Sequence, residues 1–240
     1  MKIRPLHPLI SCICITDNRP GLLLKSILSF DQQNYPNTEM VISFPVNDFE
    51  TKSLIAQLKR ISDIRILEIE RDQSESIGMA RNNAVSQCNG DYVCMWDDDD
   101  IYFFSRVADQ YNLLQGNGKY FQASIISQII LYDAIKSQGF LSFSYHWGGS
   151  LLCKKQHFLA YPCTDTNQFE YAPVINYLDV NHLLLQSDFS PQLYIYVYHG
   201  ANETDHLSFE YLSRKSAPLE QDVSDWISGY LIQEIKLNLS

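Results

Sequence analysis

The chain has 240 residues, of which 45% are hydrophobic and 12% aromatic, so it can bury a sizeable core and lacks the composition of a disordered protein. Its formal net charge of −10 and its pI near 4.9 argue against a broad electrostatic surface for nucleic acid or for an anionic membrane. We therefore expect one folded domain, residues 1–240, that does not bind nucleic acid.

The cysteines and the N-terminal residues restrict the cellular context. The six cysteines form no C-x-x-C pair and no spacing with histidine that suits zinc. Cys12 and Cys14 are two residues apart in an apolar run, so in a strand they share one face and are expected in the core. Residues 1–8 are interrupted by prolines, and no run approaches the ~18 apolar residues of a membrane span. We expect a cytoplasmic protein without a signal peptide or a transmembrane segment, and peripheral contact with a membrane stays open.

The first hundred residues alternate between apolar runs typical of strands and segments with helical spacing. Asn18 and Pro20 are of the types found where helices begin, and so is Ser76. The expected strands are residues 9–15, 40–44, 64–69 and 91–96. The expected helices start near residues 18–20, at residue 48 and at residue 76, and the last two extend to about residues 61 and 87.

Such alternation predicts βαβ units, in which parallel strands of one sheet are joined by right-handed crossovers. We expect an α/β fold with a mixed sheet that is parallel in the N-terminal half and flanked by helices. In sheets of this kind, ligands bind beyond the carboxyl ends of the strands. Functional residues are therefore expected directly after residues 91–96.

Four consecutive aspartates, Asp97 to Asp100, occupy that position. Each neighbouring pair of like charges costs roughly 1 kcal/mol at the dielectric constant of water and several times more near a protein surface. Folding is penalised unless positive charge compensates them, and carboxylate oxygens suit Mg2+ or Mn2+. The run predicts a site for a divalent cation that carries a phosphorylated ligand. A solvated acidic turn or a helix cap is the alternative interpretation.

The second half of the chain is less regular. Residues 102–114 and 171–186 are expected as helices, residues 120–132 are rich in β-formers, and residues 148–153 and 193–198 are expected as strands. A C-terminal helix is predicted from an apolar stripe, which we expect to pack on its own domain and which could also serve an interface. The stripe consists of Val223, Trp226, Ile227, Tyr230, Leu231 and Ile235. We find no repeat and no flexible linker in the sequence.

Three segments, in this order, resemble the nucleotide-sugar-binding half of family 2-type glycosyltransferases with the GT-A fold. Residues 8–19, PLISCICITDNR, look like the opening strand and T-x-N-R loop of that family. Residues 77–84, IGMARNNA, resemble its G-x-A-R-N-x-A helix, and residues 90–100, GDYVCMWDDDD, resemble its metal-binding DXD motif. The resemblance extends to about residue 106 and implies a Rossmann-like GT-A domain, with residues 1–106 as the donor half and residues 107–240 as the acceptor half and C-terminal helix.

The resemblance implies that a nucleotide diphosphate-sugar, most often a UDP-sugar, binds at the strand ends. Mn2+ or Mg2+ then bridges the diphosphate to the DXD acids and acts as a Lewis acid on the leaving group. By motif position, Asp97 faces the nucleotide ribose and contributes to the metal site, and Asp99 faces the metal, with assistance from Asp98 or Asp100. The other residues that the resemblance places at the donor are Thr16, Asn18, Arg19, Arg81 and Asp98. A plain ion pair is the alternative for Arg81.

Two departures concern the nucleobase. In the family, the second strand usually ends in an acidic pair that reads the base, whereas here only Asp48 follows, and it requires a shift of the loop. Thr16 is followed by Asp17, where an aromatic residue is common in the family. Uridine is therefore an expectation at the level of the family.

Family 2 enzymes mostly invert the anomeric centre and use one carboxylate as general base on the acceptor hydroxyl. That carboxylate usually belongs to a Glu-Asp pair that opens a helix. Here Glu170 directly precedes an apolar helical run, so it is the candidate base, although the second acid of the pair is missing. Asp165 and Asp179 are the competing candidates. A glutamate that merely complements the helix dipole is the alternative.

Further site candidates lie in two short segments. GT-A enzymes often use a late histidine as a metal ligand, and His199, in the segment His199-Gly-Ala-Asn-Glu-Thr, corresponds to it by position. Trp147 and His146 could stack on or hydrogen-bond to a sugar, and a place in the core is the alternative for Trp147.

Together these features predict a metal-dependent, inverting glycosyltransferase that moves a hexose-type sugar to a glycan or another hydroxyl acceptor, as in polysaccharide biosynthesis. A sugar nucleotidyltransferase is the first alternative, but residues 16–20 lack the Gly-rich basic loop of that class. A nucleotide-binding module that has lost its base is the second, because the segment around Glu170 departs from the family pattern.

Overall fold

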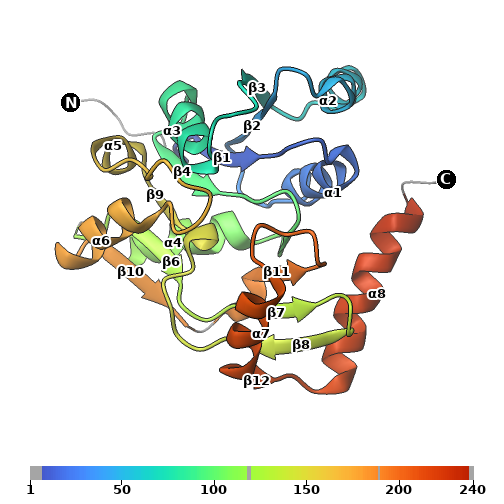
Figure 1. The fold of residues 1–240 in the computed structure, drawn as a ribbon. Coiled ribbons are helices and arrows are strands. Elements are labelled where there is room, and N and C mark those ends of the chain that lie inside the picture. Colours follow the sequence, from blue (N-terminus) through green and yellow to red (C-terminus); the bar gives the residue numbers. More distant parts are fainter. Residues whose placement is uncertain (1–6, 118–119, 189, 238–240) are drawn as a thin grey trace.

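The computed structural model describes residues 7–117, 120–188 and 190–237. The chain forms two β-sheets with helices around them (Figure 1). The strands are β1 (Ile10–Ile15), β2 (Thr38–Pro45), β3 (Ile66–Arg71), β4 (Tyr92–Met95), β5 (Ile101–Tyr102), β6 (Ala123–Ile126), β7 (Ile130–Asp133), β8 (Gln138–Leu141), β9 (Leu152–Lys154), β10 (Leu184–Ser187), β11 (Tyr194–Tyr198) and β12 (Ala217–Pro218). The helices are α1 (Pro20–Asp31), α2 (Phe49–Ile61), α3 (Ile77–Gln87), α4 (Arg106–Gly116), α5 (Lys155–Ala160), α6 (Ala172–Val180), α7 (His206–Arg214) and α8 (Gln221–Leu237), with 3-10 turns at Gly148–Ser150 and Pro191–Leu193.

The larger sheet has the strand order β10-β6-β9-β4-β1-β2-β3. Strands β3, β2, β1 and β4 are parallel, and β9 pairs antiparallel with both β4 and β6. The predicted α/β fold with a mixed sheet, parallel in the N-terminal half, is therefore confirmed. Because β1 and β4 are parallel neighbours, their carboxyl ends deliver the segment from Thr16 and the acid run Asp97–Asp100 to the same edge of the sheet.

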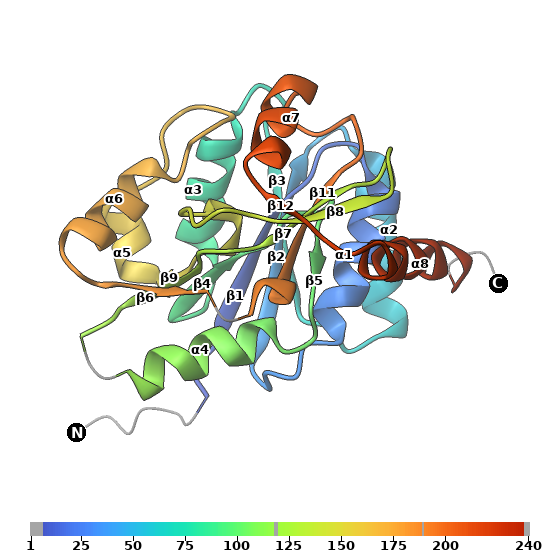
Figure 2. The same cartoon turned by 90° about the horizontal axis from the view of Figure 1, so that it is seen from below.

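Both faces of this sheet are covered, as the apolar character of its strands requires. All six residues of β1 are buried, and alternate residues point to opposite layers. Cys12 and Cys14 face the layer formed with α1, α2 and α4, and Ile13 and Ile15 face the layer formed with α3, α5 and α6 (Figure 2). The expectation that the two cysteines share one buried face is confirmed.

The smaller sheet has the order β12-β8-β7-β11-β5 and was not expected from the sequence. Its strand β5 follows the acid run directly and pairs antiparallel with β11, Ile101 opposite Ile195 and Tyr102 opposite Tyr194. This pairing carries the carboxyl end of β11, and with it His199, toward the aspartates. The second sheet therefore completes the site that the first sheet begins.

Two expected helices are shorter than predicted. Residues 102–114 do not form one helix, because Tyr102 belongs to β5 and α4 begins only at Arg106. Residues 171–186 divide into α6, a turn in which His182 has a φ of 57°, and β10. The periodicity of the consecutive leucines after that turn is compatible with a helix or a strand. They form a strand because β10 pairs with β6.

Two expected β segments are also divided. The β-rich residues 120–132 supply β6 to the larger sheet and β7 to the smaller one. Of residues 148–153, the first three form a 3-10 turn, and only the last two enter β9. The first segment changes from one sheet to the other, and the second changes from a turn to a strand, although both look continuous in the sequence.

The C-terminal helix α8 packs on the smaller sheet. Ile227 is buried, and Tyr230 and Leu231 pack against the same cluster, whereas Trp226 is 59% exposed. The predicted stripe is thus only partly buried, and the side chain of Ile235 lies outside the described residues. Within the described ranges, no helix is long and apolar enough to cross a membrane.

Candidate active site

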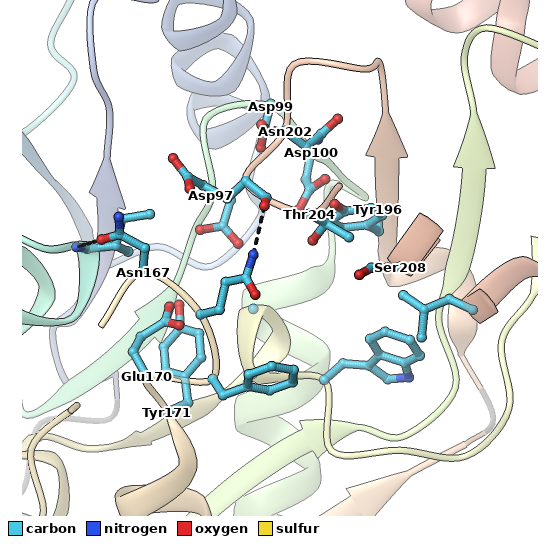
Figure 3. A pocket seen from close by; sticks show the side chains of 18 of the residues that line it. Asp97, Asp99, Asp100, Asn167, Glu170, Tyr171, Tyr196, Asn202, Thr204 and Ser208 are labelled. Carbon is cyan, nitrogen blue, oxygen red and sulfur yellow. Dashed lines mark hydrogen bonds between the residues drawn. The ribbon is translucent and has the colours of Figure 1, made fainter. Parts of the chain in front are cut away.

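A cavity of about 840 Å3 opens between the carboxyl ends of the larger sheet and the smaller sheet. Asp97, Asp99 and Asp100 lie on one side of it, and Glu170 and Tyr171 face them from another (Figure 3). A volume of this order suits a sizeable small-molecule ligand. Carboxylates that are far apart in the sequence therefore share one chamber.

Two arginines supply the positive charge that the acid run needs. Arg19 donates from Nη2 to Oδ1 of Asp98 at 2.6 Å and from Nη1 to Oδ2 of Asp99 at 3.0 Å. Arg81 donates from Nη2 to Oδ1 of Asp97 at 2.7 Å. The two arginines therefore compensate the repulsion among the aspartates within the chain itself. A cation that enters the site must compete with these guanidinium groups.

Arg81 also binds the candidate base. Its Nε donates to Oε1 of Glu170 at 3.1 Å, and its guanidinium carbon lies 4.8 Å from the ring centroid of Tyr171. The side chains of Arg81 and Glu170 are only 7% and 8% exposed, so this contact is shielded from water. Arg81 is therefore a bridge between Asp97 and Glu170 rather than a surface ion pair.

Each acid of the run has a different environment, and Asp98 is the most constrained. Thr16 donates its hydroxyl to Oδ2 of Asp98 at 2.6 Å while Arg19 occupies Oδ1. Burial, reinforced by the neighbouring charge of Asp99, raises the pKa of Asp98 to about 7 despite these two partners. Both oxygens of Asp98 are engaged, so it connects the loop after β1 to the loop after β4.

Asp100 uses both carboxylate oxygens to hold the smaller sheet. Its Oδ2 accepts the hydroxyl of Tyr194 at 2.6 Å, and its Oδ1 accepts the backbone N–H of Val197 at 2.9 Å. Burial, together with the charges of Asp99 and Asp97, raises the pKa of Asp100 well above its usual range. Its contacts fix β11 beside the acid run, which is an architectural role.

Asp99 is the acid best placed for a metal. Its Oδ2 lies 3.3 Å from Nε2 of His199 and accepts an N–H from Asn202 at 3.4 Å. Burial raises the pKa of Asp99, but the hydrogen bond with His199 and the charge of Arg19 outweigh burial, and the net shift is downward. A carboxylate that stays charged beside an imidazole suits Mn2+ or Mg2+.

The donor set is nevertheless incomplete. Among the described residues, no three His, Cys, Asp or Glu side chains are grouped so that they could hold a metal ion. Mg2+-type sites commonly use one or two carboxylates and complete the shell with phosphate oxygens and water. Asp99 and His199 therefore fit a metal that arrives with a diphosphate, and Asp97, whose Oδ1 is bound to Arg81, has one oxygen left for it.

The loop after β1 is held by a hydrogen bond to Asp48. Asn18 has a left-handed φ of 51°, and its backbone N–H donates to Oδ2 of Asp48 at 2.8 Å. The other oxygen of Asp48 caps α2 by accepting the N–H of Thr51 at 3.0 Å. Asp48 is only 2% exposed and does not line the cavity, so the structure places it beneath the donor loop. Its contact with a nucleobase stays a prediction.

Arg71, at the end of β3, is a residue that sequence reasoning missed. It is buried, and its Nη2 donates to the carbonyl of Thr16 at 3.1 Å. Its Nε is buried without a hydrogen-bond partner among the described residues. The expected third strand ended at residue 69, whereas β3 extends to Arg71, and only this extension places the arginine at the carboxyl end of the sheet with Thr16 and the acid run.

Glu170 reaches the cavity because its loop is fastened to the start of α3. The backbone N–H of Ile77 donates to Oδ1 of Asn167 at 2.9 Å, and that of Gly78 donates to the carbonyl of Thr166 at 3.0 Å. Gly78 allows this approach, since a Cβ there would lie 1.9 Å from the carbonyl oxygen of Thr164. Two of the free N–H groups of the helix are thereby satisfied and the loop is held.

The competing acids are elsewhere. Asp165 accepts the hydroxyl of Ser76 at 2.7 Å, and Asp179 is an exposed residue of α6 that lies 4.0 Å from Nε2 of His146. Neither acid lines the cavity, and neither does His146, whereas Trp147 does. Of the three carboxylates considered as base, only Glu170 faces the chamber.

A buried aromatic frame supports the acid run from behind. Arg106 is fully buried, lies 4.3 Å from the ring centroid of Tyr102 and 5.4 Å from that of Tyr194, and donates to the carbonyl of Gly149 at 2.9 Å. The hydroxyl of Tyr102 accepts the backbone N–H of Asp97 at 2.6 Å. A Cβ at Gly149 would lie 2.9 Å from Oδ2 of Asp97, so this glycine leaves room for the acid.

Comparison with protein families gives a match over most of the chain. The model of the family described as Glycosyl transferase family 2 matches residues 11–171. This range includes the loop after β1, the acid run and Glu170. It ends before the C-terminal part of the cavity wall, which contains Tyr194, Tyr196, Asn202 and residues of α7, and before His199, which lies outside the cavity lining.

Two similar curated proteins are bacterial. A glycosyl transferase of Escherichia coli strain K12 named for colanic acid biosynthesis, WcaA, is 34% identical over 104 residues, which are 42% of this chain and 36% of that protein. The GalNAc(5)-diNAcBac-PP-undecaprenol beta-1,3-glucosyltransferase of Campylobacter jejuni is 30% identical over 93 residues, 39% of this chain and 30% of that protein. The matches thus span about a third of each relative.

Among solved structures, the mannosyltransferase PcManGT of Pyrobaculum calidifontis, in complex with GDP-Man and Mn2+, superposes with a TM-score of 0.64. The superposition covers 84% of this chain and 59% of that one, at 14% sequence identity. At this identity the similarity establishes the fold.

Proposed function

The chain belongs to glycosyl transferase family 2, and from this membership we propose that it transfers a sugar from a nucleotide diphosphate-sugar to a hydroxyl group of a glycan or a similar acceptor. One observation carries the proposal. The cavity that contains the acid run also contains Glu170, so a donor bound at the aspartates lies within reach of a carboxylate that can act as a base.

The chain's own residues can bind the donor at the strand ends. Arg19 lines the cavity beside Asp98 and Asp99, so its guanidinium can share its charge with a diphosphate. Asp99 and His199 would hold Mn2+ or Mg2+, with Asp97 as the nearest further acid. When bound, such a metal supplies Lewis-acid stabilisation of the charge that develops on the leaving diphosphate.

Glu170 would remove the proton from the attacking acceptor hydroxyl. Its Oε1 is oriented by Arg81, and its second oxygen has no hydrogen bond to a side chain in the described structure. A base on the protein that activates the acceptor directly fits a single displacement, and we therefore propose inversion at the anomeric carbon. Arg81 would hold the base and Asp97 in a constant relative position throughout that step.

The proposed nucleobase and acceptor rest on the family and on the named relatives. Uridine remains our expectation for the base, while the superposed mannosyltransferase contains GDP-Man, so guanosine belongs in the test. The Campylobacter relative is named for an undecaprenol-linked glycan acceptor. We propose a hydroxyl acceptor of the glycan type for this chain.

Thermal unfolding with UDP, GDP, CMP and dTDP, each with and without Mn2+, tests the donor site. We expect one nucleotide to stabilise the protein only when Mn2+ is present. A ligand at about 100 times its Kd adds about 2.7 kcal/mol to the free energy of unfolding, and each 1 kcal/mol corresponds to about 2–4 °C for a chain of this size. Absence of a shift with all four nucleotide–metal pairs refutes the proposed donor site. Binding without transfer to any acceptor identifies a binding module instead.

A further inference from the structure

The cavity extends beyond the charged residues into a part that we call the aromatic lobe, lined by Phe143, Tyr145, Trp147, Leu207, Tyr211 and Leu212. The arginines of the cavity are paired with carboxylates of the acid run and Glu170. The lobe itself presents rings and aliphatic groups, and the cation beside it, Lys215, has its Nζ 4.4 Å from the ring centroid of Tyr211. The diphosphate of a donor gains nothing from such a wall, and Asp48, the acid expected at the nucleobase, does not line the cavity, so the lobe is available to a second ligand.

Helix α7 forms one side of this lobe and has two apolar faces. Phe209 is buried and stacks on Tyr198 with ring centroids 4.4 Å apart, which anchors the helix to β11. Leu207 and Tyr211, one helical turn apart, line the cavity and remain 74% and 57% exposed. A helix on a protein surface normally has polar residues opposite its buried face. An exposed apolar face inside a cavity indicates a surface that a ligand covers.

The opposite side of the lobe is an aromatic platform between β8 and the turn at Gly148–Ser150. Ring centroids are 5.3 Å apart for Tyr145 and Trp147 and 5.8 Å apart for Phe143 and Trp147. Ser150 fixes the platform by donating its hydroxyl to the carbonyl of Trp147 at 2.8 Å. Preformed aromatic surfaces of this kind bind flat apolar groups, and the C–H face of a pyranose ring is one of them.

We propose that the aromatic lobe binds an acceptor in which a sugar ring is joined to an apolar group. The ring lies on the platform of Trp147, and the apolar group lies along Leu207 and Tyr211. This inference rests on the proposed function, because a hydroxyl of the ring must reach Glu170, which lines the same cavity. Continuity with the chamber of the candidate base is the reason to assign the lobe to a substrate rather than to a second protein chain.

The proposal is tested by the binding of octyl β-D-glucoside, below its micelle-forming concentration, and of methyl β-D-glucoside. Calorimetry and saturation-transfer NMR should show the octyl compound binding at least roughly tenfold more tightly, because its additional methylenes reach Leu207 and Tyr211. The double variant Leu207→Ser/Tyr211→Ser should reduce that ratio to about threefold or less. Trp147→Leu should weaken the binding of both compounds. If Trp147→Leu does not fold, Tyr145→Ala, which removes a half-exposed ring of the same platform, takes its place.

The matched control is Val223→Ser/Trp226→Ser, which removes exposed apolar groups from α8, outside the cavity lining. This control should bind both glucosides as the wild type does. Loss of octyl glucoside binding in the control and not in the α7 variant overturns the proposal. Equal binding of a sugar-free amphiphile, the octyl ether of tetraethylene glycol, also overturns it, since the ring would then contribute nothing.

The same variants separate this inference from the proposed function. Stabilisation by nucleotide and Mn2+ should be retained in the α7 variant, because the charged partners of the acid run are Arg19, Arg81 and His199 rather than residues of α7. If nucleotide and Mn2+ stabilise the protein but octyl glucoside binds no more tightly than methyl glucoside, the proposed acceptor class alone is refuted. Octyl glucoside binding at the lobe without any nucleotide effect refutes the donor site and leaves the lobe as a binding site for such amphiphiles.

Discussion

The guanidinium of Arg81 touches both carboxylates on which the proposed reaction depends. It binds Asp97 at 2.7 Å and Glu170 at 3.1 Å while stacked on Tyr171. An arginine with two acids in a shielded position has little freedom to move, so the separation between the donor acids and the base is set by one side chain. Arg19 has the corresponding role for Asp98 and Asp99.

Glu170→Gln tests the base. Glutamine can still accept the hydrogen bond from Arg81, so the fold and donor binding should be retained, whereas sugar transfer should fall by about 10²–10⁴-fold because the proton acceptor is lost. The measurements are transfer to acceptor, donor hydrolysis and nucleotide affinity. Asp165→Asn, at an acid outside the cavity, is the control and should transfer normally. Transfer at the wild-type rate by Glu170→Gln excludes the residue as base.

Asp99→Asn tests the metal ligand. Loss of the carboxylate charge beside His199 should weaken Mn2+ binding in the presence of nucleotide at least roughly tenfold, since even residues that only orient metal ligands are worth 10–100-fold. Electron paramagnetic resonance of free Mn2+ measures the affinity. Asp63→Asn, on an exposed loop after α2, should bind the metal normally. Unchanged Mn2+ affinity in Asp99→Asn rejects the assignment.

At the scale of elements, the site depends on how β5 and β11 are joined. In the antiparallel pair Tyr194 lies opposite Tyr102 and Ile195 lies opposite Ile101. Asp100 bonds to both Tyr194 and Val197, and these two contacts favour this register. His199 follows β11 directly, so its distance to Asp99 depends on that register. Asp100 would therefore influence where Asp99 and His199 hold a metal, without being one of the proposed ligands.

Asp100→Ala should leave the hydroxyl of Tyr194 and the N–H of Val197 without their partner. A buried polar group without a partner costs about 1–3 kcal/mol, so we expect a loss of about 2–4 kcal/mol in the free energy of unfolding. Denaturant unfolding measures it, and a double-mutant cycle with Tyr194→Phe should give a coupling of at least about 0.5 kcal/mol. Additive effects of the two substitutions contradict the proposed linkage.

At the scale of the whole molecule, the residues of the site and a network that stabilises the fold lie at opposite ends of the strands of the larger sheet. The cavity lies at the carboxyl ends of its parallel strands, while a buried network around Glu39 lies near their amino ends. Ser11 donates its hydroxyl to Oε1 of Glu39 at 2.7 Å, and Asn89 donates its amide to Oε2 at 2.9 Å. This network connects β1 and β2 to the turn before β4 without contributing to the site.

Glu39 should make the protein sensitive to acid. Burial raises its pKa, but the hydrogen bonds from Asn89 and Ser11 outweigh burial and the net shift is downward. The stabilisation is therefore complete above the unfolded pKa of about 4.3 and is lost as the pH falls through the lower pKa of the folded state. Glu39→Gln should be less stable at pH 7 and lose less stability on acidification, as measured by urea unfolding across pH. Exposed Glu220→Gln is the control, and a wild-type pH profile in Glu39→Gln contradicts the role of Glu39.

Much of the larger sheet could be predicted because its signals are local. The apolar runs of β1, β2 and β4 and the cap at Ser76 are recognisable within a few residues, and Ser76 does accept the N–H of Met79 at 3.2 Å. The β10 segment could not be recognised, because Leu184 and Leu185 suit a helix or a strand and only their pairing with β6 decides. Partner strands that are distant in the sequence leave no local periodicity to read.

By itself the sequence determined the alternation of strands and helices, the carboxylates at the end of β4 and the need of those acids for positive charge, because each follows from neighbouring residues. Only the tertiary structure decided what supplies that charge and what each acid does. Arg19 precedes α1 and Arg81 belongs to α3, Asp100 turns toward β11, and Glu170 joins the acids only because its loop is fastened to α3. These contacts connect residues far apart in the chain, and the spatial arrangement of such residues follows from packing of the whole molecule.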